Sequence, residues 1–263
     1  MSAHDVRRVL LRSPAKTCAL DTLPTSVLLE LVDVLLLFIR VMCNISPREG
    51  CLPRTQKTAI ITPVLKKQNA DQDEPNNYRP ISKLTFISKV LERIVEEQVT
   101  QHLEEADLMS EFQSAYRKHH CTVSALMKVP SDILDAADSR QVTLLGLLDL
   151  SAAFDTVDHD ILLVRLETSF AIGGSVLTWR KSLLSDRQQA VSLNGVTSAF
   201  YSVVCGVPPG SILGLLLFLL YTADVALIAQ RHHVAVHSYA DDTQLYASCS
   251  ATDGSTSAPA LHH

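Results

Sequence analysis

Apolar residues recur with a helical period in several long segments of the chain. Residues 88–103 show this most clearly, because six apolar positions fall on one face of a helix: Val90, Leu91, Ile94, Val95, Val99 and Leu103. The same period predicts further helices over residues 22–43, 122–137, 158–169, 176–184 and 211–221. The apolar stretch from Val34 to Ile39 predicts burial on most sides of its helix, and Pro130 is expected to kink the helix over 122–137.

Other segments have the pattern of β-strands. Residues 58–66 predict a strand with a basic end. The continuous apolar run at 142–150 ends in an acid, which is typical of a buried central strand with a polar residue at its tip. Asn194-Gly195 suits a type I′ turn and predicts a hairpin over 190–204. Residues 234–247 predict a second hairpin, whose turn carries two adjacent aspartates.

Composition and charge narrow the class of protein. The chain has 263 residues, of which 47% are hydrophobic and 19% charged, and this excludes a mainly disordered protein. The formal net charge of −5 argues against a simple basic nucleic-acid-binding module. The charge is uneven, however: residues 54–93 carry eight Lys or Arg against four Asp or Glu, whereas residues 121–263 carry seven against thirteen. This asymmetry suggests a backbone-binding surface beside a carboxylate-rich site.

Cysteine and membrane signals are mostly negative. The six cysteines form no CxxC pair and no zinc-binding spacing, and scattered single cysteines fit a reducing compartment. The apolar run Ile212–Tyr221 is too short to span a bilayer, and the N-terminus lacks the pattern of a signal peptide. We therefore expect no membrane association and no secretion.

Three acids are the candidates for chemistry. Asp149 ends one expected strand, and Asp241 and Asp242 lie at the tip of the second hairpin. If these strands are neighbours in one sheet, three carboxylates converge at its edge and repel one another unless cations lie between them. Two Mg²⁺ ions would fit such a set. Taken alone, the Asp241-Asp242 pair has the simpler interpretation of a solvated turn.

Five motifs in a fixed order favour the metal site over the solvated turn. They are Asn77-Tyr-Arg-Pro-Ile-Ser82, Gln113-Ser-Ala-Tyr-Arg-Lys118, Asp149-Leu-Ser-Ala-Ala-Phe-Asp155, Gly206-Val-Pro-Pro-Gly-Ser-Ile-Leu-Gly214 and Tyr239-Ala-Asp-Asp242. This array resembles the reverse transcriptase of non-LTR (LINE-type) retrotransposons, of the sort found in vertebrate genomes.

The resemblance implies an α+β fold with the fingers and palm of a right-hand polymerase, in which helices flank an antiparallel palm sheet. It covers residues 18–249, with fingers over about 18–120 and a partial palm over about 121–249. The chain stops soon after the YADD motif, so we expect the thumb to be absent. Residues 250–263 are expected to be a disordered tail.

The resemblance also implies roles for residues in the acidic site and its neighbours. Asp149, Asp241 and Asp242 match the catalytic acids that hold two Mg²⁺ ions, with Mn²⁺ as a substitute. Phe154 matches a steric gate against the ribonucleotide 2′-hydroxyl, with core packing as the alternative. Pro209 occupies the position where the family has Gln beside the nascent base pair, in the turn that also contains Gly210.

Five cations complete the implied site. Arg117 and Lys118 match the segment that contacts the incoming triphosphate, and a solvated turn is the alternative. Lys66, Lys67 and Arg79 match the basic fingers region over template and nucleotide, and a solvated basic loop is the alternative.

The function implied is RNA-directed DNA polymerase, with an RNA template, a DNA primer and dNTPs as partners and the nucleus or cytoplasm as location. Pro209 and the early end of the chain favour an alternative, namely an inactive or co-opted relic that at most binds nucleic acid or protein. A metal-dependent nuclease is a third interpretation, although the acids match polymerase spacing better.

Overall fold

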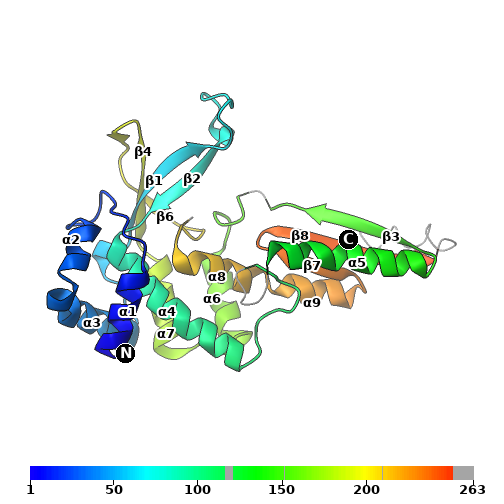
Figure 1. Cartoon of the computed structure of the whole chain (residues 1–263), viewed down its shortest axis with the longest axis horizontal. Helices are drawn as coiled ribbons and strands as arrows, with labels where there is room; N and C mark the ends of the chain where they lie inside the picture. The colour runs from blue at the N-terminus through cyan, green and yellow to red at the C-terminus, as the bar shows by residue number, and fades with distance from the viewer. Residues whose placement is uncertain (116–120, 151, 209, 251–263) are drawn as a thin grey trace. The chain divides into compact units, whose positions relative to one another are not determined.

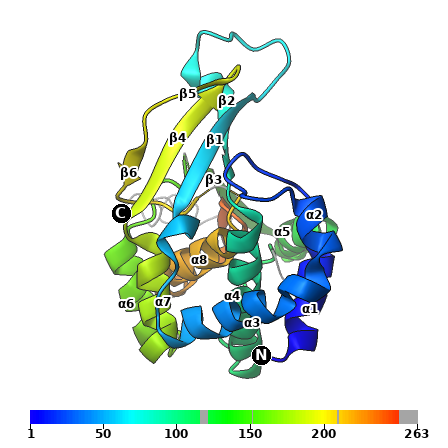
Figure 2. The same ribbon diagram turned by 90° about the vertical axis from the view of Figure 1, so that its left-hand side faces the viewer.

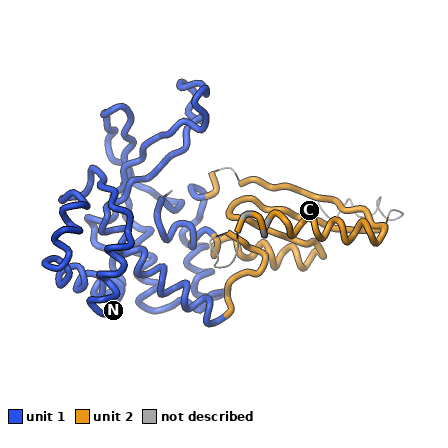
Figure 3. The backbone as a smooth tube through the Cα atoms, in the orientation of Figure 1, with its two compact units in different colours: residues 1–106, 154–218 blue, residues 107–153, 219–263 orange. Residues whose placement is uncertain are grey.

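The computed structural model describes residues 1–115, 121–150, 152–208 and 210–250 (Figure 1). The chain forms two compact units, coloured separately in Figure 3. The first contains residues 1–106 and 154–218, and the second contains residues 107–153 and 219–263. Each unit is therefore assembled from two separate stretches of sequence.

The first unit is built around helix α4, Phe86–Glu105. The six apolar residues expected on one face of this helix are all buried, which confirms the helical period. The other helices of this unit are α1 (Ala3–Arg12), α2 (Thr25–Glu30), α3 (Val32–Arg48), α6 (His159–Thr168), α7 (Gly174–Leu184) and the start of α8 (Ile212–Thr222). Short 3₁₀ turns, η1 and η2, cover Arg54–Gln56 and Pro75–Asn77.

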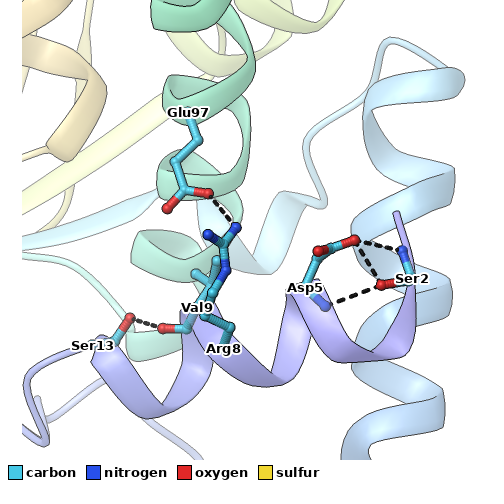
Figure 4. Close-up of polar contacts among 6 residues, drawn as sticks. All are labelled: Ser2, Asp5, Arg8, Val9, Ser13 and Glu97. Atoms are coloured by element: carbon cyan, nitrogen blue, oxygen red, sulfur yellow. Dashed lines mark hydrogen bonds and ion pairs between the residues drawn. The ribbon is translucent and has the colours of Figure 1, made fainter.

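Local hydrogen bonds fix the ends of α1 (Figure 4). Ser2 Oγ accepts a bond from the Asp5 N–H at 3.2 Å, and the Asp5 carboxylate accepts one from the Ser2 N–H at 3.0 Å. This reciprocal cap satisfies two donors that the helix cannot pair internally. Arg8 pairs with Glu97 of α4 at 3.1 Å, and Ser13 Oγ donates to the Val9 carbonyl at 2.7 Å.

The expected helix over 22–43 is two helices, and its expected burial is wrong. The chain breaks at Leu31, between α2 and α3. Within α3, Val34, Leu37 and Phe38 are 63–70% exposed. The reason is that α3 packs through a narrow stripe containing Val32, Ile39 and Cys43, so the remaining apolar positions lie on its outer side.

A mixed sheet completes the first unit (Figure 2). Strand β1 (Thr58–Leu65) pairs antiparallel with β2 (Tyr78–Lys83) and parallel with β4 (Arg187–Leu193). Strand β4 also pairs with β5 (Val196–Thr197) and β6 (Tyr201–Val203). Asn194 and Gly195 both have positive φ, at 51° and 83°. This confirms the expected type I′ hairpin turn.

The second unit contains a three-stranded antiparallel sheet in the order β3–β8–β7. Its strands are β3 (Gln141–Leu148), β7 (Ala235–Tyr239) and β8 (Asp242–Ser250), with helices α5 (Thr122–Asp138) and α9 (Asp224–Arg231) beside them. Ala229 of α9, Val234 and Val236 form a small core, against which Phe112, Ala226 and Leu245 pack. The second hairpin and the antiparallel sheet are thus confirmed.

The expected burial of the strand over 142–150 is wrong. Among the described residues, β3 lies at the edge of the sheet and pairs with β8 alone. Five of its apolar side chains are 40–70% exposed, namely Val142, Leu144, Leu145, Leu147 and Leu148. A continuous apolar run shows that a strand can be covered on both faces, but it does not show which strand of the sheet is central.

The apolar segment after residue 211 is longer than expected. Helix α8 ends at Thr222 and α9 begins at Asp224, so the two helices form a nearly continuous segment of 20 residues, 212–231. By length and composition alone, this segment could cross a membrane. A core helix meets the same criteria. Leu213, Leu217 and Phe218 are at most 2% exposed, so this stretch is weak evidence for a membrane span.

A charged hydrogen-bond network joins α5 to β8 in the second unit. The Tyr246 hydroxyl donates to the Asp132 carboxylate, and Lys128 Nζ contacts both Asp132 oxygens at 2.7 Å. Burial by itself raises the pKa of Asp132. The hydrogen bonds from Lys128 and Tyr246 outweigh it, so this pKa lies below its ordinary value.

We expect Tyr246→Phe to lower the free energy of unfolding by about 1–2 kcal/mol, since it removes a bond to a charged acceptor that is 29% exposed. Because the folded-state pKa of Asp132 is depressed, the contribution is complete above about pH 5 and is lost as the pH falls through that pKa. Urea denaturation at several pH values measures both effects. Tyr239→Phe is the control, and an equal loss in both variants would contradict the network.

Candidate functional site

The strand register carries the three candidate acids to the same end of one sheet. Leu148, the last residue of β3, pairs with Thr243 of β8, and Asp149 follows it directly. Tyr239 of β7 pairs with Asp242, so the hairpin turn consists of Ala240 and Asp241. The sequence-based expectation that strand tip and hairpin tip share a sheet edge is therefore confirmed for the backbone.

Two of the three acids are open to solvent. Asp149 and Asp242 are exposed and Asp241 is half-buried. Within the described ranges, no ion pair involves any of the three, and no cluster of three or more His, Cys, Asp or Glu side chains could hold a metal ion. The expected close approach of the acids around a cation therefore stays a prediction.

Gln113, a residue with no expected role, contacts the hairpin turn. Its amide Nε2 donates to the Ala240 carbonyl at 3.1 Å, and its Oε1 accepts from the Ala240 N–H at 2.9 Å. The side chain is 8% exposed. Gln113 begins one of the five motifs, but nothing in a single sequence shows which main-chain groups a glutamine will contact.

In the first unit, the turn that begins at Gly206 is tied to the segment containing Phe154. The Gly206 N–H donates to the Val157 carbonyl at 2.8 Å, and the Val207 N–H donates to the Phe154 carbonyl at 2.7 Å. Gly206 has φ +82°, and a Cβ there would lie 2.8 Å from the Asp155 carbonyl oxygen. Only glycine suits both the conformation and this close approach.

Phe154 itself is half-buried, and its ring packs on Phe218 with centroids 4.8 Å apart. This contact is the core packing that was the alternative to a steric gate. One face of a ring can pack while its edge meets a substrate, so the gate role stays a prediction.

The far end of the same turn approaches strand β2. Gly210 has φ +98°, and a Cβ there would lie 2.9 Å from the Ser82 carbonyl oxygen. Two separate motifs of the sequence, at 77–82 and 206–214, are therefore in backbone contact. Pro209 lies outside the described residues, as do Arg117 and Lys118.

Three expected nucleic-acid contacts lie at one end of the β1–β2 hairpin. Lys66 and Lys67 directly follow β1, and Arg79 on β2 pairs with Val64. The Lys66 N–H donates to the Asn77 carbonyl at 2.8 Å, which closes this end of the ladder. All three cations are exposed, as a phosphate-binding surface requires, although a solvated basic loop has the same exposure.

Glu92 is a second residue whose part the sequence does not reveal. It lies on α4, is 0% exposed, and caps the start of α8. Its Oε2 accepts from Ser211 Oγ at 2.6 Å and from the Ile212 N–H at 2.8 Å. Burial lowers the pKa of Arg187, and the nearby Glu92 carboxylate partly offsets that effect. Glu92 thus fixes the helix that follows the Gly206–Gly210 turn.

We expect Glu92→Gln to cost about 1.5–3 kcal/mol of the free energy of unfolding, because the amide loses the charge and one acceptor facing the α8 N-terminus. Glu97→Gln, on the same helix, removes only the pair with Arg8, whose side chains are 46% and 34% exposed, and should cost less than about 1 kcal/mol. Urea denaturation compares the two. Similar losses would show that the buried cap is unimportant.

Comparing Gly206→Ala with Gly195→Ala separates two costs of a Cβ: the unfavourable backbone conformation and the clash with neighbouring atoms. Both glycines have positive φ, but nothing lies within 4 Å of a Cβ at Gly195. We expect Gly195→Ala to cost about 1–2 kcal/mol from conformation alone, and Gly206→Ala about 1–3 kcal/mol more from the clash with Asp155. Thermal unfolding measures the difference. Equal costs would mean that the turn moves freely away from Asp155.

Comparison with known proteins gives the family. The model of the reverse transcriptase (RNA-dependent DNA polymerase) family matches residues 64–257, a range that extends into the expected tail. The probable RNA-directed DNA polymerase from transposon X-element of Drosophila melanogaster is 33% identical over 222 residues, which cover 84% of this chain and 24% of that protein. The RNA-directed DNA polymerase from mobile element jockey of Drosophila funebris is 31% identical over 237 residues, covering 87% and 25%.

A third relative, the probable RNA-directed DNA polymerase from transposon BS of Drosophila melanogaster, is 30% identical over 236 residues, covering 88% of this chain and 26% of that protein. The chain thus spans about a quarter of the length of these curated relatives. They are insect elements, so the expected vertebrate affiliation stays a prediction. The family match and these relatives together show that the chain belongs to the reverse transcriptase family, as a domain of the kind carried by non-LTR retrotransposons.

Proposed function

We propose that this chain carries out RNA-templated DNA synthesis, in which a primer 3′-hydroxyl attacks the α-phosphorus of a dNTP and pyrophosphate leaves. The observation that carries the proposal is the register of the β3–β8–β7 sheet, which brings Asp149, Asp241 and Asp242 to one end. In this proposal the three-stranded sheet belongs to the palm, and the β1–β2 hairpin belongs to the fingers.

The donor set suits a hard divalent cation. All three candidate ligands are carboxylates, whose oxygens Mg²⁺ prefers, and Mg²⁺ needs few protein ligands when substrate phosphates supply others. Asp149, Asp241 and Asp242 would hold Mg²⁺, or Mn²⁺ in its place. When bound, the ions would activate the attacking hydroxyl and neutralise charge on the leaving group.

The other residues in this proposal bind and orient the substrates. Lys66, Lys67 and Arg79 contact template and nucleotide phosphates, and Arg117 and Lys118 contact the triphosphate. Phe154 and Gly210 line the nucleotide. The hydrogen bonds of the Gly206 turn hold the segment that contains Phe154, and Gly210 lies close to the Ser82 carbonyl. Pro209 offers no side-chain amide, so it leaves the nascent base pair without that contact.

One observation favours a second function, a relic that binds nucleic acid without polymerising. The residue at position 209 is Pro instead of the Gln that the resemblance leads us to expect. A chain of this kind would keep the exposed cations of the β1–β2 hairpin and lose productive nucleotide positioning, because near-attack geometry tolerates little displacement.

Single-nucleotide incorporation on a primed RNA template tests the proposal. We expect Asp149→Asn and Asp241→Asn each to reduce incorporation with Mg²⁺ or Mn²⁺ by about 100-fold or more. Each substitution removes a carboxylate that binds the metal directly, and loss of a residue that only supports such a ligand already costs about 10- to 100-fold. Asp135→Asn, on the exposed side of α5 in the same unit, is the matched control.

Incorporation by the parent chain that survives both substitutions would rule out these acids as the catalytic set. No incorporation by the parent, together with retained binding to primed RNA, would support the relic instead.

A further inference from the structure

The turn that carries Asp241 has an unfavourable conformation for its sequence. Ala240 is the first of two residues between the paired Tyr239 and Asp242, and its φ is +57°. Glycine is favoured where the first position of a two-residue hairpin turn has positive φ, since a Cβ is disfavoured there. The turn therefore needs support from outside the hairpin to keep this conformation.

The Gln113 side chain supplies that support. Its amide binds both main-chain polar groups of Ala240, donating to the carbonyl at 3.1 Å and accepting from the N–H at 2.9 Å. The same Oε1 also accepts from the Ala115 N–H at 3.0 Å. These bonds fix the side-chain amide against two segments at once, so Ala240 cannot rotate without breaking bonds to a buried group.

Gln113 is itself anchored to the sheet. The Ser238 N–H donates to the Phe112 carbonyl at 2.7 Å, and the Ser114 N–H donates to the Ser238 carbonyl at 3.0 Å. Residues 112–114 thus lie beside β7 as a short parallel partner. The segment that carries Gln113 and the turn that Gln113 holds are therefore both attached to β7.

Packing leaves a small space beside the turn. A cavity of about 40 Å³ lies against it, lined in part by Gln113, Ala240 and Thr243. The volume is comparable to that of a single water molecule. The two hydrogen bonds between Gln113 and Ala240 hold the peptide groups on either side of Ala240 next to this space.

We propose that Gln113 is a positioning residue that holds the Ala240-Asp241 turn so that Asp241 and Asp242 present their carboxylates in a binding geometry. The link to metal and catalysis rests on the proposed function. The physical reason is that a ligand's orientation depends on the hydrogen bonds that fix its supporting groups, and a small misplacement is costly. Gln113 acts through Ala240 and touches no reacting atom in this scheme.

Amide hydrogen exchange in the full 263-residue chain tests the hold on the turn without any need for activity. Gln113→Met removes both bonds at similar volume, and Gln113→Asn keeps the amide but shortens it by one methylene. We expect the Ala240 N–H to exchange about 10-fold faster in both variants. Gln244→Met, on β8 of the same sheet, is the control and should exchange at the parent rate. Parent-like exchange in the Gln113 variants would overturn the proposal, and Gln113→Asn decides it if Gln113→Met does not fold.

Mn²⁺ affinity, followed by electron paramagnetic resonance, tests positioning as distinct from stability. We expect Gln113→Asn to weaken Mn²⁺ binding by about 10-fold, the low end of the range for lost outer contacts to a metal site, when both proteins are measured well below their melting temperatures. Unchanged affinity despite faster exchange would overturn the positioning role. A parent chain that binds no Mn²⁺ would contradict the proposed function, and the exchange comparison would still decide whether Gln113 holds the turn.

Discussion

The structure of the candidate site depends on the pairing of β8 with a strand on each side. Carboxylates repel one another, so the side chains of three acids at one sheet end do not favour being brought together there. The main-chain ladders from Gln141–Ser250 to Leu148–Thr243, and from Ala235–Tyr246 to Tyr239–Asp242, hold them there instead. A shift of one residue in either ladder would move every side chain of that strand to the other face. Register is thus the quantity that decides whether a cation site can exist.

In the first unit, the candidate residues are held by close contacts between backbone segments instead of by the pairing of strands. Gly206 lies against Asp155 and Gly210 lies against Ser82, and both positions leave no room for a Cβ. The Glu92 carboxylate then fixes the first turn of α8, using a charge that is fully removed from solvent. A buried carboxylate is costly unless its hydrogen bonds are satisfied. Here the helix N-terminus supplies the donors, so one residue stabilises the helix and its preceding turn together.

The sequence predicts a structural element correctly where residues close together in the chain determine its conformation. The buried face of α4, the Asn194-Gly195 turn and the hairpin around the two aspartates follow from residues close together in sequence, and the structure confirms them. The burial of β3 and of α3 could not be predicted, because it depends on which distant segments cover them. Gln113 and Glu92 were missed for the same reason: each contacts main-chain groups about 120 residues away. Arg117, Lys118 and Pro209 lie outside the described residues.

Paramagnetic broadening by Mn²⁺ tests the central claim most directly, that the sheet register builds one carboxylate site from separate strands. Substoichiometric Mn²⁺ is added to the isotopically labelled chain, and the backbone amide signals are followed by NMR. We expect residues 148–150 and 240–243 to broaden together, while Gln141 and Ser250, paired at the opposite end of the sheet, stay sharp. Broadening confined to a single strand, or spread evenly over both ends of the sheet, would contradict the account.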